Sequence, residues 1–152
     1  MRDQPVAADP GRRGILLHAG VFGVIALDGA GMITAFDHGD EFIAVVESGD
    51  HAGAIERYYT EDASMQENAA PPRVGRDGLV AHERGILART SNVYSKAMSS
   101  VVEGDRVAIH WIFELTSLSG RVHRVDEIAM QEWRGDKIFR ERFFYDPGPP
   151  KS

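Results

Sequence analysis

Residues 58–75, which read YYTEDASMQENAAPPRVG, determine how the rest of the chain is organised. They run from an aromatic helix end through an acidic turn to a short run of alternating polarity, which predicts a strand, and then to a Pro/Gly loop. The residues before this stretch favour helices, whereas those after the next helix alternate as strands do. Glu67 lies near the end of the predicted strand, just before a loop that the following helix must fold back across. Glu67 is therefore the first candidate for a reactive group.

Length and composition restrict the class of protein. A chain of 152 residues is long enough for one domain with a substantial core and too short for two ordinary domains. The hydrophobic content of 43% and the charged content of 26% are typical of a globular protein in water. A net charge of −6 argues against a nucleic-acid partner, which requires a basic face. The absence of cysteine excludes disulfides, thiol catalysis and cysteine-ligated metals.

The N-terminal region is predicted to be a poorly specified leader, residues 1–35, ahead of a single domain at residues 36–152. Its apolar run, residues 15–27, is shorter than the ~20 residues of a membrane-spanning helix, so no membrane contact is expected. The pair Arg12-Arg13 before this run resembles the start of an export signal, but no Ala-x-Ala cleavage site follows. We expect a cytoplasmic protein and leave an export signal open.

The periodicity of the remaining chain predicts an α+β fold. A helical pattern covers three segments, residues 36–48, 50–59 and 77–90. The pattern then alternates, which predicts four long strands at residues 93–102, 106–117, 121–133 and 137–145. Tight Gly-containing turns join these strands, so consecutive strands must be antiparallel. The order of elements indicates three helices packed on one face of a strongly curved antiparallel sheet that encloses a cavity.

The register of the sheet decides which side chains face the helices. If Ser119-Gly120 centres a hairpin, position 113 faces 126 and 111 faces 128, with an uncertainty of one residue. One face then carries Val107, Ile109, Trp111, Phe113, Leu115, Ile128, Met130, Phe139, Glu141, Phe143 and Tyr145, with Asp126 and Glu141 as the two acids on it. A β-bulge would exchange the faces, and the cavity would then be lined by His110, Glu114, Glu127 and Gln131.

Four motifs together resemble the nuclear-transport-factor-like superfamily, and within it the SnoaL-like and ketosteroid-isomerase-like proteins. They are YTEDASMQEN at residues 59–68, PRVG at 72–75, WRGDKI at 133–138 and FYDP at 144–147. The resemblance covers residues 36–147 and implies a cone-shaped α+β barrel. It identifies an activity less well than a fold, because this fold carries isomerases, cyclases, hydrolases, dehydratases and proteins without chemistry.

The resemblance also implies roles for individual residues. In ketosteroid isomerases an acid at the end of the first strand transfers the proton, and Glu67 lies at that position. A protonated acid on the penultimate strand donates to the developing oxyanion, and Asp126 lies on that strand, about one pleat away. The tyrosine of the family's first helix has no counterpart, because Phe42 or a neighbour takes its place. This departure counts against steroid isomerisation itself.

We therefore predict a site with Glu67 as general base, its pKa raised by an apolar pocket, and Asp126 as acid or hydrogen-bond donor. The alternative for either residue is a solvated carboxylate. The predicted pocket wall, which would otherwise be plain core, consists of Phe42, Tyr59, His82, Trp111, Phe113, Met130, Glu141, Phe143 and Tyr145. Scattered histidines and the lack of phosphate-binding glycine motifs predict no metal and no cofactor.

Two classes of function follow. The first is a cofactor-independent isomerase or polyketide-type cyclase that acts by proton transfer on a small, mostly apolar carbonyl compound. The second is a non-catalytic ligand-binding or dimerisation module with the same cavity. A second copy of the chain is the expected protein partner, because the opposite sheet face mixes charges with apolar side chains; it carries His110, Glu114, Arg140 and Arg142 with Ile112 and Trp133 interspersed.

Overall fold

The computed structural model describes residues 35–148. The predicted leader at residues 1–35 falls outside this range except for its last residue, so its role stays a prediction. Three helices are present in the described range, α1 (Ala35–Glu47), α2 (His51–Tyr58) and α3 (Arg76–Leu87). None of them combines the length and the apolar character that crossing a bilayer would require.

The helices form where the sequence places apolar side chains one turn apart and supplies boundaries. Phe42 and Val46 on α1 are buried and lie four positions apart in the sequence, as expected for one face of a helix. Asp50 caps α2 by accepting a hydrogen bond from the backbone N–H of Gly53 at 3.0 Å. The chain enters α3 through Gly75, whose φ of +100° is rarely adopted by residues with a side chain.

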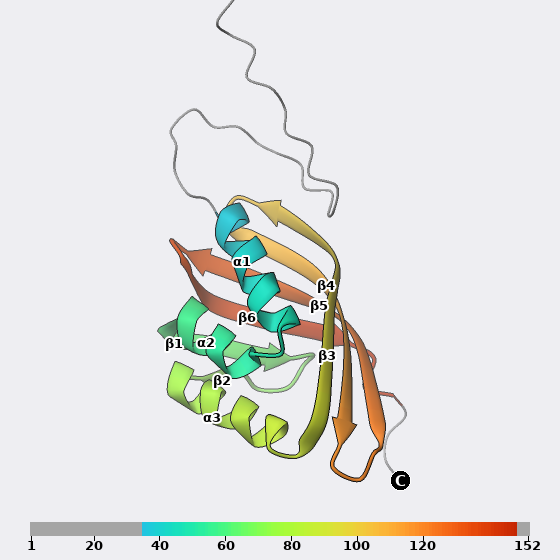
Figure 1. The fold of residues 1–152 in the computed structure, drawn as a ribbon. Coiled ribbons are helices and arrows are strands. Elements are labelled where there is room, and N and C mark those ends of the chain that lie inside the picture. The colour runs from blue at the N-terminus through green and yellow to red at the C-terminus, as the bar shows by residue number, and fades with distance from the viewer. Residues whose placement is uncertain (1–34, 149–152) are drawn as a thin grey trace, which may run out of the picture.

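Six strands form one curved sheet in the order β2-β1-β6-β5-β4-β3 (Figure 1). Their bounds are Tyr59–Glu67 for β1, Arg73–Val74 for β2, Thr90–Glu103 for β3, Arg106–Ser117 for β4, Val122–Arg134 for β5 and Lys137–Tyr145 for β6. The expected α+β fold with three helices on a curved sheet is confirmed, but the sheet is mixed and not closed. Strand β1 runs parallel to β6. This direction is possible because a long stretch of chain, and not a tight turn, connects the two strands.

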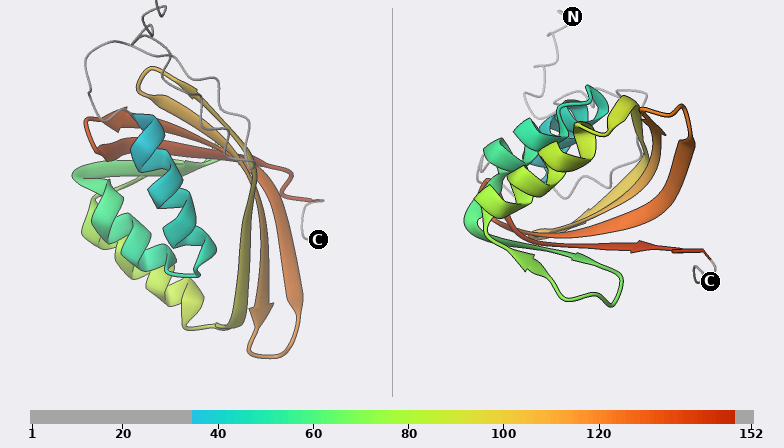
Figure 2. Two further views of the ribbon diagram at one scale, coloured as in Figure 1. Left: turned by 45° about the horizontal axis from the view of Figure 1, so that its top comes forward. Right: turned by 90° about the horizontal axis from the view of Figure 1, so that it is seen from below.

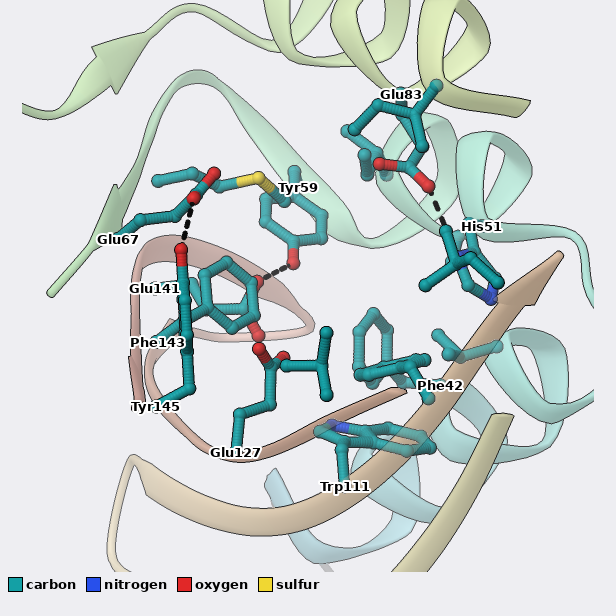
Figure 3. A pocket seen from close by; sticks show the side chains of 18 of the residues that line it. Phe42, His51, Tyr59, Glu67, Glu83, Trp111, Glu127, Glu141, Phe143 and Tyr145 are labelled. Carbon is teal, nitrogen blue, oxygen red and sulfur yellow. Dashed lines mark hydrogen bonds and ion pairs between the residues drawn. The ribbon is translucent and has the colours of Figure 1, made fainter. Parts of the chain in front are cut away.

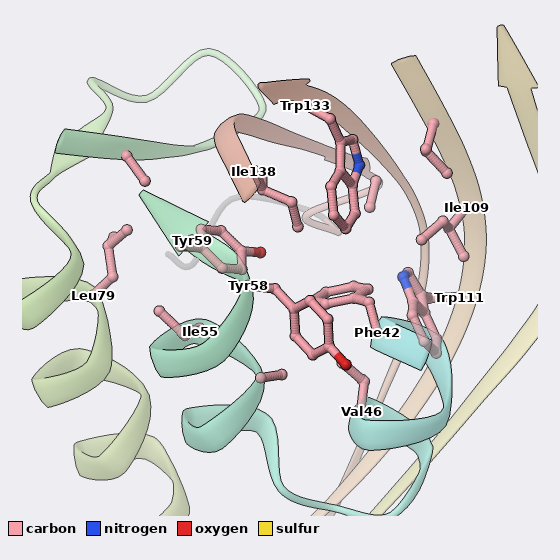
Figure 4. Close-up of a cluster of buried hydrophobic side chains, with 14 of the residues drawn as sticks. Phe42, Val46, Ile55, Tyr58, Tyr59, Leu79, Ile109, Trp111, Trp133 and Ile138 are labelled. Atoms are coloured by element: carbon pink, nitrogen blue, oxygen red, sulfur yellow. The ribbon is translucent and has the colours of Figure 1, made fainter. Parts of the chain in front are cut away.

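The helices lie inside the curve of the sheet, as Figure 2 shows. Buried side chains from the helices and from the sheet form one hydrophobic core. Figure 4 shows the centre of this core, where aromatic rings from α1, α2 and the sheet meet aliphatic side chains. The ring of Phe42 makes an edge contact with Trp133, with centroids 6.4 Å apart. The principal buried side chains are Phe42, Val46, Ile55, Tyr58, Tyr59, Leu79, Ile109, Trp111, Trp133 and Ile138.

The β4–β5 hairpin differs by one residue from the expected register. Three residues, 118–120, form the loop, with the N–H of Ser117 bonded to the carbonyl of Arg121 at 2.9 Å and Gly120 at a φ of +84°. Phe113 therefore faces Val125 and Trp111 faces Glu127. Because side chains alternate along a strand, this single step turns β5 over. The inner positions are Val125, Glu127, Ala129, Gln131 and Trp133, and the predicted inner positions of Asp126, Ile128 and Met130 are wrong.

Strand β6 contains a bulge near its start. Glu132 pairs with Arg140 but Trp133 pairs with Ile138, so the register shifts by one residue between them. As a result Ile138 and Glu141, three residues apart, are both buried against the helices. Phe139 was expected on the same inner face, and that prediction is wrong. Its ring instead lies under the exposed guanidinium groups of Arg134 and Arg140, 4.6 and 5.7 Å from the ring centroid.

Candidate functional site

A cavity of about 370 Å³ lies between the helices and the concave face of the sheet. This volume falls in the range of small-molecule binding sites. Its walls are mainly aromatic and aliphatic, and the polar groups are concentrated on a few side chains, four of which are glutamates (Figure 3). The lining residues are Phe42, Val46, His51, Ala54, Ile55, Tyr59, Met65, Glu67, Glu83, Ile86, Trp111, Phe113, Leu115, His123, Val125, Glu127, Glu141, Phe143 and Tyr145.

Glu141 anchors a chain of buried hydrogen bonds on the sheet side of the cavity. The indole N–H of Trp133 donates to Gln131 Oε1 at 3.1 Å, and Gln131 Nε2 donates to Glu141 Oε1 at 2.7 Å. The indole can only donate, which fixes the orientation of the Gln131 amide. The hydroxyl of Tyr59 donates to the other oxygen of Glu141. Burial raises the pKa of Glu141, the two donors oppose the rise, and the result is a pKa of about 7.

Tyr59 reaches this chain because helix α2 passes directly into strand β1 at this residue, whose backbone is extended. Its ring is buried and packs at a tilt against Phe42, with centroids 6.2 Å apart. Burial, followed by the charge of Glu141, raises the pKa of the Tyr59 hydroxyl well above its usual value. The hydroxyl therefore acts as a fixed donor that holds the Glu141 carboxyl in place.

Glu127 has a different environment. It is 9% exposed, points into the cavity, and makes no hydrogen bond with any residue that the structure describes. Burial raises its pKa most, and the nearby charges of Glu141, Glu67 and Glu83 raise it further, to about 8. A carboxyl group with this pKa carries a proton at neutral pH. Glu127 is therefore a hydrogen-bond donor directed into an apolar cavity.

Glu67 lies at the mouth of the same cavity, where β1 ends. Tyr145 donates its hydroxyl to Glu67 Oε2 at 2.7 Å, and Arg73 donates to Oε1 at 2.8 Å. Burial raises the pKa of Glu67, but the bonds from Tyr145 and Arg73 and the charge of Arg73 outweigh it, so that the pKa is lowered. The expected rise is therefore wrong, and Glu67 is an ionised carboxylate. The hydrogen bond to Glu67, followed by burial, raises the pKa of Tyr145 to about 12.

His51, at the start of α2, occupies the opposite wall. Its Nδ1 lies 3.1 Å from a Glu83 oxygen and its Nε2 lies 2.7 Å from the Ser95 hydroxyl. The imidazole also makes an edge contact with Phe113, with centroids 5.6 Å apart. Because both ring nitrogens are engaged, His51 presents its carbon edge to the cavity and acts as a fixed part of the wall.

Comparison with known proteins identifies the fold family. A model of the SnoaL-like domain matches residues 40–141, most of the part of the chain that builds the cavity. The chain belongs to the SnoaL-like family. A search of curated proteins finds no match to this SnoaL-like protein.

Solved structures share the fold of this SnoaL-like protein. A putative SnoaL-like polyketide cyclase from Mesorhizobium loti is 24% identical, with a TM-score of 0.64 over 74% of this chain and 100% of the other. An uncharacterised cystatin-fold protein from Novosphingobium aromaticivorans is 21% identical, with a TM-score of 0.64 over 74% and 98%. A ketosteroid-isomerase-like protein from Catenulispora acidiphila, in complex with trimethylamine, is 17% identical, with a TM-score of 0.62 over 71% and 85%. At these identities the likeness shows the fold alone.

Eight of the predicted site residues line the cavity of this SnoaL-like protein, and they come from α1, β1, β4 and β6. They are Phe42, Tyr59, Glu67, Trp111, Phe113, Glu141, Phe143 and Tyr145. Their roles stay predictions. Sequence reasoning missed His51 and Glu83, because lone polar residues on helices carry no signal for a cavity. Sequence reasoning placed Glu127 in the cavity only in the alternative register of the sheet.

Three predicted residues lie elsewhere. Asp126 is on the outer face of the sheet, 2.8 Å from His110 Nε2, because the hairpin loop is one residue longer than expected. Met130 is turned outward by the same step. His82 is exposed on α3 and does not line the cavity, since that helix directs Glu83 and Ile86 inward. In the alternative register His110 and Glu114 would have entered the cavity, but neither does.

No three side chains of the types that bind metals come together within residues 35–148. The four glutamates that line the cavity, Glu67, Glu83, Glu127 and Glu141, make different contacts. Chemically, the cavity offers one ionised carboxylate at its mouth, one buried donor without a partner, and one carboxyl group held by two donors. This set supports acid–base chemistry on a neutral organic molecule.

The raised pKa values of Glu127 and Glu141 predict that stability falls as the pH rises. Both groups stay protonated in the folded chain at pH values where the unfolded chain has lost these protons. Their contribution is complete below the unfolded pKa of about 4.3 and is lost as the pH rises through 7 to 8. The free energy of unfolding should decrease by on the order of a few kcal/mol between pH 5 and pH 9.

Urea denaturation at a series of pH values measures this effect. Glu127→Gln should make the whole decrease smaller, because glutamine does not titrate, and should remove most of it between about pH 7 and pH 8, where Glu141 no longer contributes. Glu67 has a lowered pKa and changes stability only below this window, so it does not disturb the comparison. A free energy of unfolding that is constant or rises from pH 5 to pH 9 would contradict the burial of two titrating carboxyl groups.

Proposed function

We propose that this SnoaL-like protein binds a small, mostly apolar carbonyl compound and moves a proton at the carbon next to the carbonyl group, as an isomerase or polyketide-type cyclase does. One observation carries the proposal: the cavity shifts the pKa values of two of its glutamates in opposite directions. The pKa of Glu127 is raised to about 8 by burial, whereas hydrogen bonds lower the pKa of Glu67. Two carboxyl groups whose pKa values are pushed apart supply an acid and a base.

The chemistry assigns one role to each group. Glu67, as carboxylate, takes a proton from the carbon next to the carbonyl group. The electron pair of the broken C–H bond forms a carbon–carbon double bond, and the π pair of the carbonyl group moves onto its oxygen. Glu127 donates its O–H to this oxygen and stabilises the developing charge. Return of the proton to a different carbon gives an isomer. Attack of the enolate carbon on a second carbonyl group of the same molecule closes a ring.

The apolar lining supports this assignment because it excludes water and strengthens the hydrogen bond from Glu127. Glu141 is held by Tyr59 and Gln131, so it has no free donor for the ligand and acts as a support. The family membership and the likeness to a putative polyketide cyclase agree with a carbonyl substrate. Glu127 replaces Asp126 in the role of acid that the sequence had predicted.

Exchange of hydrogen for deuterium tests the reaction without knowledge of the natural substrate. Acetophenone and cyclohexanone, incubated with the protein in deuterated buffer, should lose the NMR signals of the hydrogens next to their carbonyl groups faster than in buffer alone. The expected acceleration depends on protein concentration and saturates with ketone. Binding of either ketone without any acceleration would contradict the catalytic proposal and favour the non-catalytic binding module.

We also infer that the outer face of the sheet pairs with a second copy of the chain. Ile128 and Phe144 lie side by side on β5 and β6, and Met130 lies two residues along, each about two-fifths exposed. Several charged neighbours on this face are paired within the chain, as in His110–Asp126, and the guanidinium of Arg142 lies over the Phe144 ring, 4.7 Å from its centroid. Such a patch fits a self-complementary partner. The expected contributions of Ile112 and Trp133 are absent, because both are buried.

The oligomeric state tests this pairing. Light scattering after size exclusion should give a dimer for the wild type, and Met130→Lys should shift it to the monomer because a charge would be buried in the apolar contact. Val101→Lys, at an exposed position of β3 outside this cluster, is the matched control and should leave the dimer intact. A wild-type monomer at millimolar concentration would contradict the inference.

A further inference from the structure

The register of the sheet places Glu127 between two aromatic side chains on the inner face. Trp111 lies directly opposite it on β4, and Tyr145 lies directly opposite it on β6. Residues paired in this way have Cβ atoms about 5 Å apart, so the two rings flank the carboxyl group. Phe113 stacks on Trp111 with centroids 5.3 Å apart and extends the aromatic wall. A buried carboxyl group thus lies at the base of an aromatic surface.

The charges around this group all have one sign. Glu67 on β1, Glu83 on α3 and Glu141 on β6 face Glu127 across the cavity, and the hydroxyls of Tyr59 and Tyr145 are the nearby neutral groups. Among the described residues that line the cavity there is no lysine or arginine, and the basic side chains are His51 and His123. His51 is engaged by Glu83 and Ser95. The cavity therefore disfavours an anionic ligand. Arg73 pairs with Glu67 and His51 contacts Glu83, but no basic side chain among the described residues pairs with Glu127.

From this geometry we infer that the cavity binds organic ammonium ions, with the cationic group seated at Glu127 between Trp111 and Tyr145. Glu127 has no hydrogen-bond partner among residues 35–148 and is nine-tenths buried, so it is available to a ligand. Aromatic faces attract a desolvated alkylammonium group through their electron-rich surface, in addition to its attraction to a carboxylate. The cavity of about 370 Å³ has room for such a group and an attached chain.

The cation and a proton compete for the same carboxyl group. In the free protein Glu127 holds a proton at neutral pH, because burial and the neighbouring glutamates raise its pKa to about 8. A bound ammonium ion would replace that proton and stabilise the carboxylate. Affinity should therefore increase with pH, and binding near neutral pH should release a proton to the buffer. This inference goes beyond the proposed proton transfer, which needs Glu127 protonated, so an ammonium ion would also compete with a carbonyl ligand.

Choline and its uncharged carbon isostere, in which a tert-butyl group replaces the trimethylammonium group, test the inference by titration calorimetry. Wild-type protein at pH 9 should bind choline at least tenfold more tightly than the isostere. Its affinity for choline should fall by roughly 90-fold from pH 9 to pH 6, as Glu127 takes up its proton. Equal binding of the two compounds at pH 9, or no binding of choline, would overturn the inference.

Two variants on the same strand locate the site. Glu127→Gln should bind choline and the isostere equally and lose the pH dependence. Asp126→Asn removes a neighbouring acid on the outer face and should behave as the wild type. Preference for choline that survives in Glu127→Gln would overturn the assignment to this residue. Because no ketone is present in these titrations, their failure is distinguishable from failure of the proton-exchange assay.

Discussion

Glu67→Gln is expected to lower the rate of ketone hydrogen exchange by about 100- to 10,000-fold, the range over which a positioned general base contributes to catalysis. Glutamine has the same shape as glutamate and still accepts a hydrogen bond from Arg73 through its amide oxygen, but it cannot take up a proton. The loss should appear in the maximal rate, with little change in ketone affinity. The measurement is deuterium incorporation followed by NMR at saturating ketone.

Glu61→Gln is the matched control, because Glu61 lies on the same strand, is exposed, and contacts only the Arg76 guanidinium at 3.8 Å among the described residues. Its rate should equal that of the wild type. If Glu67→Gln retained wild-type exchange, Glu67 would have no role as the base. The lowered pKa would then mark a carboxylate that only holds Tyr145 and Arg73 in place.

Glu127→Gln is expected to slow the same exchange by about 100- to 1,000-fold, the range found when one donor to a developing oxyanion is lost. Glutamine donates a weaker hydrogen bond than a carboxylic acid and cannot transfer a proton. The wild-type rate should also fall as the pH rises through 8, because Glu127 then loses its proton, whereas the variant should lack this decrease. Rates measured from pH 5 to pH 9 give both results.

Asp126→Asn provides the comparison on the adjacent residue, whose side chain faces the other side of the sheet. It should leave the rate and its pH dependence unchanged. A loss in Asp126→Asn that matches the loss in Glu127→Gln would mean that the acid acts from the outer face, and the assigned register would fail. Thermal denaturation of both variants separates a loss of fold from a loss of chemistry.

The sequence was sufficient to predict the helices, the four long strands, the inner face of β4 and the inner face of β6 beyond its bulge. These faces alternate cleanly, with Trp111 and Phe113 on one strand and Glu141, Phe143 and Tyr145 on the other. Strong alternation fixes a face because a shift of one residue would expose every large apolar side chain. The parallel pairing of β1 with β6 could not be predicted in this way, since it depends on contacts between segments far apart in the chain.

Strand β5 was predicted with the wrong face, for a reason visible in its residues. Because Asp126 and Glu127 are adjacent acids, either face of the strand would have carried a carboxylate. The apolar residues Ile128 and Met130 then favoured their own face as the inner one, although it is the outer face. The length of the hairpin loop decides which face of β5 points inward, because a three-residue loop shifts the register by one residue relative to a two-residue turn. Trp133 held the missing signal, because burial of a large aromatic ring places Gln131 and Glu127 on the inner face by alternation.

The roles within the site depended on contacts that the sequence does not contain. Glu67 was correctly placed near the loop, but its pKa is set by Tyr145 and Arg73, which reach it from β6 and β2. Glu127 acquires its raised pKa from burial and from the charges of three glutamates on other elements. Such shifts arise from three-dimensional proximity, and one-dimensional patterns carry no information on them.

Titration of the glutamate carboxyl groups by carbon-detected NMR shows whether the cavity holds Glu127 protonated and Glu67 ionised, on which both proposed roles depend. In the wild type one carboxyl resonance should titrate near pH 8 and should be missing in Glu127→Gln, and the resonance missing in Glu67→Gln should titrate below the usual value. If the resonance missing in Glu127→Gln instead titrated near 4.3, the value of a free glutamate, Glu127 would be a solvated carboxylate and the proposed acid would be lost.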